Sequence, residues 1–537
     1  MLRLLPVALQ NWEWYPQPYP ESDTSLRSRV CGDIGTQPHS ILCSGPDGQH
    51  HEIASVGRGM STGLANGVAV TIFGEHANYV GMHFWNMAQR QVEAKHSDAA
   101  SKHVLFNEQS RGGEYRPRAL VFDRAEGFGS LGHADVQSTG DDERDQESAH
   151  WGGATEVHRQ KPYNQPAAGD QPQDRVRFWS DFRQVSFDSR SLGVVSGVEF
   201  GNSLGEMTTF DEGSRVVAGT DARGDVLEDG FRAHAEACDH VQGFQALADA
   251  SGGFAGYAAA FIERVRDEYP KAPVVLYSVD AAATRDSVAK AGRRAVDAAV
   301  ATVAAFENTS VDVSLYAPSR VRGPFAGVGG GDLLGNSGLL AMNVAQWTQP
   351  LVEGSRVMDD IVALVTQQGY LRSAESMVSP ALQGIGGMVA ADVIDCRFTA
   401  CSDVLVGADG LRELGGAFTV DRGTAFGDML ADRLPAPARM RSAEGSAVLP
   451  STFPRILCGI GADGFQKQAP SADAGPVDQV CVAGLLCTTR ATAGHLQRLR
   501  SALSTEGSKH LKDYERDTIR ELRYVLDGEI DKYLEIG

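Results

Sequence analysis

The sequence predicts an α/β protein built around a mainly parallel β-sheet that is flanked by helices. Three short apolar runs support this prediction, at residues 68–73, 119–122 and 274–279. Nearly continuous apolar runs of this length are typical of strands that are covered on both faces. Helical patterns separate the runs, and strands joined through helices lie parallel with right-handed crossovers. We therefore expect a sheet with helices on both faces.

The length of the chain limits the number of domains, and its net charge limits the classes of partner that it can bind. The chain has 537 residues, 42% of them apolar, which is more than one hydrophobic core usually spans. It carries 49 basic and 69 acidic side chains, for a net charge of −20. Such a surface repels phosphate backbones, so nucleic acid is not an expected partner. No uncharged apolar run reaches about 18 residues, so we expect no transmembrane segment and no secretion signal.

The eight cysteines indicate neither a disulfide scaffold nor a metal site. Two pairs lie close in sequence, Cys396 with Cys401 and Cys481 with Cys487. These spacings are loose for zinc, and no Cys-x-x-Cys or histidine pair accompanies them. We expect ordinary buried thiols at these positions.

The first part of the chain has three sections of different character. Residues 1–66 mix proline, glycine and serine without a sustained period, which predicts a weakly ordered extension that is a poor match to a mitochondrial presequence. The strand at 68–73 follows, then a tight turn at 74–78 and an amphipathic helix. The strand at 119–122 ends in an aspartate, and residues 124–175 are polar and acidic, which predicts a solvated insertion.

A glycine-rich turn lies in the middle of the chain. Aromatic residues at 178–182 are expected to anchor a loop on the core, and residues 231–245 are expected to form a helix. The glycine-rich turn at 251–256 then opens another helix before the strand at 274–279. Such a turn can present backbone N–H groups and a helix dipole to a phosphate. The same glycines can instead permit close packing of a helix, and the sequence leaves both interpretations open.

The second half of the chain is patterned less clearly. Residues 285–307 are rich in alanine and valine, which predicts a long buried helix that connects two domains. Apolar runs continue to about residue 495, and a helix with one apolar face ends the chain. We therefore expect an extension (1–66), a nucleotide-type domain with its insertion and connecting helix (67–310), a second α/β domain (311–500) and a C-terminal helix (501–537).

Several of these segments resemble the tubulin superfamily, and within it the Misato family. Residues 74–85 (GEHANYVGMHFW) are similar to the first phosphate turn of tubulins, and residues 115–123 (YRPRALVFD) to their next strand. Residues 235–245 (AEACDHVQGFQ) and the glycine turn after them resemble the stretch around the tubulin glycine signature. The sequence FWSDF at 178–182 and the polar insertion before it indicate Misato and not a polymer-forming tubulin. The resemblance covers residues 68 to about 310, and less of the chain to about 395.

The resemblance implies a tubulin-like, Rossmann-like fold with a long central helix and a nucleotide-type site. The resemblance assigns no catalytic residue and no certain cofactor. Binding of GTP or GDP with Mg²⁺ is left as an open alternative. The expected cofactor-binding residues are Gly74, Glu75, His76, Asn78, Ser251, Gly252, Gly253, Gly256 and Asp297.

Two of the phosphate positions depart from tubulins. Glu75 stands where tubulins have a glutamine that faces the phosphates, and Phe254 where a threonine hydroxyl would meet phosphate. A carboxylate about 4 Å from a phosphate charge costs on the order of 4 kcal/mol at an effective dielectric constant near 20, unless Mg²⁺ lies between them. We therefore do not expect tight binding of a triphosphate.

The base and hydrolysis positions depart as well. Val296 and Asp297 align with the tyrosine and asparagine that tubulins offer to guanine, and Asp297 could accept from guanine N–H groups or act as a capping carboxylate. The acidic residue that tubulins place near the metal is displaced here, beyond Asp123. No Gly-x-x-Asn-x-Asp loop follows the predicted helix at 339–352, so hydrolysis coupled to polymerisation is expected to be absent or vestigial.

The resemblance implies a non-catalytic regulator of mitochondrial distribution, morphology and inheritance. It would act in the cytoplasm and peripherally at the cytosolic face of the mitochondrion, through mitochondrial outer-membrane or cytoskeletal proteins. Without an anchor of its own, membrane association would need a protein partner. Two alternatives stay open: a GTPase in which Mg²⁺ bridges Glu75 to the phosphates, and an adaptor for tubulin folding or microtubule organisation that binds tubulin or the cytosolic chaperonin.

Overall fold

The computed structural model describes residues 42–44, 50–52, 66–131, 176–316, 333–379, 415–421, 442–454 and 478–535, with short gaps inside the longer ranges. The chain divides into two units, residues 1–62 and 63–537. In the first unit, β1 (Leu42–Ser44) pairs with β2 (His50–Glu52) in antiparallel fashion. The predicted weakly ordered extension otherwise lies outside the described residues.

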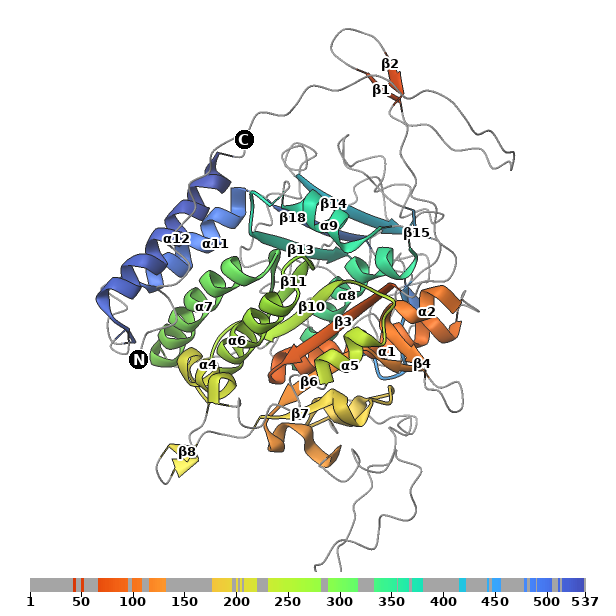
Figure 1. Ribbon diagram of the computed structural model, residues 1–537, viewed down its shortest axis with the longest axis horizontal. Coiled ribbons are helices and arrows are strands. Elements are labelled where there is room, and N and C mark those ends of the chain that lie inside the picture. Colours follow the sequence, from red (N-terminus) through yellow and green to blue (C-terminus); the bar gives the residue numbers. More distant parts are fainter. Residues whose placement is uncertain are drawn as a thin grey trace, which may run out of the picture. The chain divides into compact units, whose positions relative to one another are not determined.

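A ten-stranded sheet forms the centre of the larger unit (Figure 1). Its strand order is β15-β14-β18-β13-β12-β11-β10-β3-β6-β7. Neighbouring strands from β13 to β7 are all parallel, which confirms the predicted α/β fold. These strands are β3 (Asn66–Phe73), β6 (Ala119–Asp123), β7 (Leu192–Val194), β10 (His240–Asp249), β11 (Val274–Asp280), β12 (Val311–Tyr316) and β13 (Ser373–Ser379).

The strands from the C-terminal half extend this same sheet. β18 (Ala483–Thr488) is antiparallel to both β13 and β14 (Gly415–Asp421), and β15 (Ser442–Ala443) forms the edge. Three short pairs lie outside the sheet: β4 (Phe106–Glu108) with β5 (Tyr115–Pro117), β8 (Glu199–Phe200) with β9 (Ser203–Leu204), and β16 (Ala447–Val448) with β17 (Gln479–Val480). The predicted domain boundaries near 310 and 500 stay predictions.

Helices cover both faces of the parallel part. Alternate residues of a strand point to opposite faces, and β3 shows this division. Val70 and Ile72 belong to the core under α1 (Glu75–Ala94) and α8 (Leu333–Val352), whereas Ala69 and Phe73 belong to the core under α6 (Gly253–Glu268). Both faces of the strand are therefore buried, as its continuous apolar run predicts.

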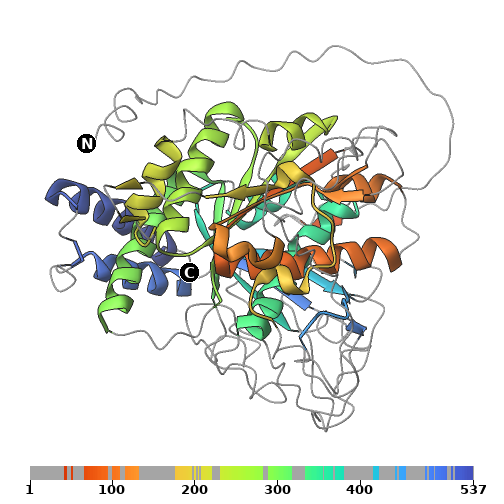
Figure 2. The same cartoon turned by 90° about the horizontal axis from the view of Figure 1, so that it is seen from below.

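A third apolar core lies to the side of the sheet. It joins α7 (Val288–Asn308) to α11 (Arg490–Ala502) and α12 (Arg516–Leu534). Figures 1 and 2 show the blue α11 and α12 beside α7, at the side of the sheet away from α1. The predicted C-terminal helix is thus present as α12, packed through residues such as Leu526 and Tyr533.

Shorter elements complete the described part of the chain. The helices are α2 (Ala99–Leu105), α4 (Phe210–Gly219), α5 (Phe231–Glu236) and α9 (Met358–Val365), and the 3₁₀ segments are η1 (Ala125–Leu131), η4 (Trp179–Phe182) and η5 (Ser189–Ser191). Trp179 and Phe182 are buried, which confirms that the aromatic motif anchors a loop on the core. The predicted insertion beyond residue 131, and the side chains of the two cysteine pairs, lie outside the described residues. No helix in the described ranges is long and apolar enough to cross a lipid bilayer.

The prediction of a helix over residues 231–245 is wrong. The helix α5 ends at Glu236, and the strand β10 begins at His240. β10 lies in the middle of the sheet, where residues 242–248 are all buried. Gln242, Gly243 and Gln245 interrupt its apolar run, so the strand lacks the continuous run that identified the other central strands, and its alanines favoured the helical interpretation.

The two long helices α7 and α8 pack in different places. α7 contacts α6, α11 and α12, whereas α8 contacts α1. Sixteen of the twenty residues of α8 are buried, so this helix is enclosed on nearly all sides. The small and apolar residues of 285–307 indicated a buried helix. These residues allow α7 to fit between α6 and the C-terminal helices.

Candidate functional site

Candidate site residues gather where four neighbouring parallel strands end. Glu75 follows β3, and Asp123, Asp249 and Asp280 are the last residues of β6, β10 and β11. Ligands of parallel α/β proteins bind at this edge of the sheet, near helix N-termini. We call residues 74–78, 123, 249–253 and 280 the carboxyl-edge site.

The first turn of the site joins β3 to α1. Gly74 has φ +95°, a backbone conformation that favours glycine, and α1 begins at the exposed Glu75, earlier than the apolar pattern indicated. The His76 Nδ1 lies 3.8 Å from Asp280 Oδ1. The Ala77 backbone N–H donates to Asp249 Oδ1 at 2.8 Å. This bond ties the start of α1 to the end of β10, so the two predicted turns lie side by side.

Asp249 is a site residue that the sequence analysis missed. Burial raises its pKa to about 7, His76 and the Ala77 N–H oppose the rise, and Asp123 and Glu75 add to it. The Asp249 carboxyl group therefore interacts electrostatically with charged side chains from α1 and β6. The available signal was an aspartate just before a glycine-rich turn, and it was lost because the preceding residues were interpreted as a helix.

Asn78 holds a carboxylate of the protein. Its Nδ2 donates to Asp123 Oδ2 at 2.9 Å and to the Phe122 carbonyl oxygen at 3.1 Å. Trp179 Nε1 also donates to Asp123 Oδ2, at 2.8 Å, and the Arg124 N–H donates to Asp123 Oδ1 at 2.8 Å. Burial still raises the pKa of Asp123. The Asn78 amide group is therefore already used to fix Asp123.

The glycines of the second turn are needed for helix packing. A Cβ on Gly253 would lie 2.4 Å from the Met207 carbonyl oxygen, and one on Gly256 would lie 1.8 Å from the Phe210 carbonyl oxygen. Phe210 is the first residue of α4 and Met207 lies just before this helix, which rests directly on α6. Gly252 has φ +80° and forms the N-cap of α6. Close packing, one of the two interpretations left open by the sequence, therefore explains Gly253 and Gly256.

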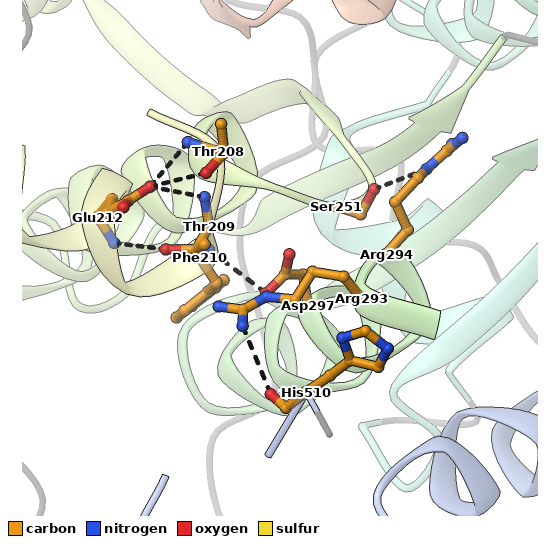
Figure 3. Close-up of polar contacts among 9 residues, drawn as sticks. All are labelled: Thr208, Thr209, Phe210, Glu212, Ser251, Arg293, Arg294, Asp297 and His510. Atoms are coloured by element: carbon orange, nitrogen blue, oxygen red, sulfur yellow. Dashed lines mark hydrogen bonds and ion pairs between the residues drawn. The ribbon is translucent and has the colours of Figure 1, made fainter. Parts of the chain in front are cut away.

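An arginine from α7 joins the second turn to β11. Arg294 Nη2 lies 2.7 Å from Asp280 Oδ2, and its Nε donates to Ser251 Oγ at 3.4 Å. Figure 3 shows Arg294 extending toward Ser251. The positive charge beside the glycine turn is thus paired with a carboxylate of the protein.

Asp297 faces the first turn of α4 and not the strand ends (Figure 3). Its Oδ1 accepts from the Phe210 N–H at 3.5 Å and lies 3.4 Å from Arg293 Nε. Burial raises the pKa of Asp297 to about 6. Glu212 Oε2 accepts from the Thr208 and Thr209 N–H groups at 2.8 and 3.0 Å. Two carboxylates therefore cap α4, which favours the capping alternative for Asp297 over base recognition.

α8 contributes a second residue that the sequence analysis missed. Asn336 is fully buried, and its Nδ2 donates at 3.1 Å to the carbonyl oxygen of Ala281, which directly follows β11. Its Oδ1 accepts no hydrogen bond from the described residues. The sequence predicted a helix from residue 339, whereas α8 begins at Leu333, so an asparagine one turn before the predicted start gave no signal.

The carboxyl-edge site is rich in acceptors, and three of its donors are engaged by the protein itself. Ala77 N–H is bonded to Asp249, Asn78 to Asp123, and Arg294 to Asp280. A phosphate would meet carboxylates, each of which costs on the order of 4 kcal/mol at about 4 Å and an effective dielectric constant near 20. Within the described ranges, no three His, Cys, Asp or Glu side chains are grouped to hold a metal. These residues therefore do not fit a triphosphate.

A Ser–His–Asn contact forms between residues of η5, α5 and β4. His234 Nε2 lies 3.2 Å from Ser191 Oγ, and its Nδ1 lies 3.1 Å from Asn107 Nδ2. An amide nitrogen only donates, so Nδ1 accepts and Nε2 carries the proton toward the serine. Ser191 is fully buried, and burial lowers the pKa of His234 to about 4. The imidazole cannot act as a base on Ser191, so the contact is structural.

Comparisons with known proteins agree with this architecture. Residues 68–170 match the Misato Segment II tubulin-like domain, and residues 168–346 match a tubulin domain. Protein dml-1 of Neurospora crassa is 27% identical over 259 residues, which cover 45% of this chain and 47% of that protein. Protein DML1 of Gibberella zeae is 30% identical over 243 residues, which cover 42% of this chain and 48% of that protein.

A mouse protein is similar to this chain over a stretch of comparable length. Protein misato homolog 1 of Mus musculus is 27% identical over 241 residues, which cover 38% of this chain and 43% of that protein. The chain thus spans about half the length of the curated relatives it matches. Through residues 68–346, the chain belongs to the Misato family of tubulin-like proteins.

Proposed function

We propose that this protein is a non-catalytic, tubulin-like regulator of mitochondrial distribution, morphology and inheritance. The family assignment supports the role, because the resemblance to Misato implies it. The proposed location is the cytoplasm and the cytosolic face of the mitochondrion. The proposed partners are outer-membrane or cytoskeletal proteins.

The non-catalytic part of the proposal rests on one observation: two donors of the site are paired with carboxylates of the protein. Catalysis of phosphoryl transfer depends on donors and cations that are positioned for the transferred group. Here the Ala77 N–H and Arg294 are both paired with carboxylates of the protein. The start of α4 is likewise capped by Glu212 and Asp297. This arrangement supports the proposal that the protein acts by binding partners and not by catalysis.

A replacement experiment tests the cellular role. The gene for the Misato relative would be depleted in a fungal cell, and this chain would be expressed in its place. We expect restored mitochondrial morphology and inheritance, seen by fluorescence microscopy of a matrix marker. The variant Arg294→Gln should restore them equally, because the proposed role does not use phosphate chemistry. Failure of the unchanged chain, expressed at the level of the relative, would contradict the proposal.

The adjacency of the two turns favours one rival, a Mg²⁺-dependent GTPase in which the metal bridges Glu75 to the phosphates. Binding of GTP measured with and without Mg²⁺ separates the two. Tight binding only with Mg²⁺, with the dependence removed by Glu75→Gln, would favour the rival. Capture of tubulin or of the cytosolic chaperonin by the purified chain would instead favour the adaptor alternative.

A further inference from the structure

A carboxylate of the protein accepts from one of the backbone N–H groups that open α1, that of Ala77. The first N–H groups of a helix have no partner within the helix, and they attract anions. In α1 the helical bonds begin with Asn78, whose N–H donates to the Gly74 carbonyl oxygen at 2.8 Å. The preceding N–H, on Ala77, donates to Asp249 Oδ1. Asp249 thus takes the place that an external anion would occupy.

The turn closely surrounds this carboxylate. A Cβ built on Gly74 would lie 2.5 Å from Asp249 Oδ2 and 2.9 Å from the Phe254 Cβ. The carboxylate therefore rests directly against the bare backbone of Gly74, and Phe254 adjoins it at the start of α6. The absence of a side chain at position 74 serves the protein's own carboxylate, and little room is left between the two turns.

Charges from the neighbouring elements act on this position. His76 on α1 favours a negative charge there, whereas Glu75 on α1 and Asp123 on β6 disfavour it. A phosphate in the same place would experience the same neighbours. It would also compete with a carboxylate that is covalently attached to β10 and so is always present at high effective concentration.

We propose that Asp249 is a built-in ligand, whose side chain occupies the anion position at the start of α1 and thereby excludes nucleotide phosphate. The proposal rests on the proposed non-catalytic function and names the residue that closes the site. The proposal predicts that a substitution that removes the side-chain acceptor at position 249 creates an anion site. A substitution that removes only the charge, and keeps the acceptor, should not create one.

Two variants of the full chain separate occupancy from charge. Asp249→Ala removes both the charge and the acceptor, whereas Asp249→Asn removes the charge but keeps an oxygen for the Ala77 N–H. Glu75 is unchanged in both proteins, so any difference between them arises at position 249. Calorimetric titration with inorganic pyrophosphate, and with GTP, should show at least tenfold tighter binding to Asp249→Ala than to Asp249→Asn or the unchanged protein.

The other outcomes would overturn the proposal. Equal gains in the two variants would show that charge and not occupancy excludes the anion, and no gain in Asp249→Ala would show that the position is not an anion site. Tight binding by the unchanged protein would also overturn this proposal, whereas failure of the unchanged chain in the replacement experiment would count against the proposed function, so the two failures are distinguishable. Asp249→Ser provides a second emptied variant, for which the same gain is expected if Asp249→Ala does not fold.

Hydrogen exchange at Ala77 gives an independent readout. Its amide should be protected in the unchanged protein and in Asp249→Asn, exchange at least tenfold faster in Asp249→Ala, and regain protection when pyrophosphate is added. Unchanged exchange in folded Asp249→Ala would contradict the proposal.

Discussion

Gly213 of α4 faces the Gly253 carbonyl oxygen of α6 so closely that a Cβ on Gly213 would lie 1.7 Å from it. The obstructing atom belongs to the backbone and cannot move aside as a side-chain end could. Gly213→Ala should therefore force α4 away from α6 and lower the free energy of unfolding by about 1–3 kcal/mol, the usual range for overpacking. Thermal or urea unfolding followed by circular dichroism measures this change.

Gly528 supplies the matched control for this substitution. It lies inside α12, where an added Cβ would meet no atom within 4 Å. Gly528→Ala should raise the free energy of unfolding by about 0.5–1 kcal/mol, because alanine favours a helix over glycine. If both variants change stability by the same amount and in the same direction, the proposed role of glycine in α4–α6 packing is wrong.

Trp179 and Asp123 give a second prediction. Trp179→Phe keeps an aromatic ring in the core but removes the N–H that donates to Asp123 Oδ2 at 2.8 Å. Loss of a donor to a buried carboxylate should lower the free energy of unfolding by about 1–3 kcal/mol. In the background of Asp123→Ala the same substitution should have a smaller effect, and a double-mutant cycle with chemical unfolding tests this coupling. Additive effects would show that the bond contributes nothing.

A buried acid on β12 gives a prediction on pH. Asp312 is almost fully buried and accepts from Ser278 Oγ at 2.6 Å, yet burial raises its pKa from 3.8 to about 6. Because the raised pKa belongs to the folded state, its stabilising contribution is present below pH 3.8 and is lost as the pH rises through 6. The unfolding free energy of Asp312→Asn, minus that of the unchanged protein, should therefore increase by about 2 kcal/mol from pH 4 to pH 7.

The slope with pH is the decisive quantity in that experiment. The new amide N–H₂ group adds a constant offset, but it does not titrate. Chemical unfolding at several pH values gives the difference directly. A difference that stays constant across this range would show that Asp312 has an ordinary pKa in the folded protein.

The sequence predicted the fold class well because the parallel strands are short, apolar and bounded by turns. The strands at 68–73, 119–122 and 274–279 all appear close to their predicted limits. β10 was not predicted, because glycine and glutamine interrupt its apolar run and the alanines at 246 and 248 suit a helix as well. Local pattern therefore identified strands with continuous apolar runs better than a strand that is rich in alanine.

The candidate site was predictable only in part, for a related reason. The two turns around Gly74 and Gly252 were identified by resemblance, and the sheet does bring them together. Asp249 and Asn336 became site residues only through contacts with segments 172 and 55 residues distant in the chain. For Asp297 the alignment left base recognition and capping open, and helix packing turns its carboxylate toward α4. Such contacts depend on how the helices pack, which spacing alone does not determine.

Calorimetric titration of the purified, unchanged chain with GTP in the presence of Mg²⁺ tests the central claim most directly. The internal pairing of Ala77 with Asp249 and of Arg294 with Asp280 predicts no saturable binding at micromolar GTP. Stoichiometric binding with a micromolar or lower dissociation constant, accompanied by GTP turnover, would contradict the account.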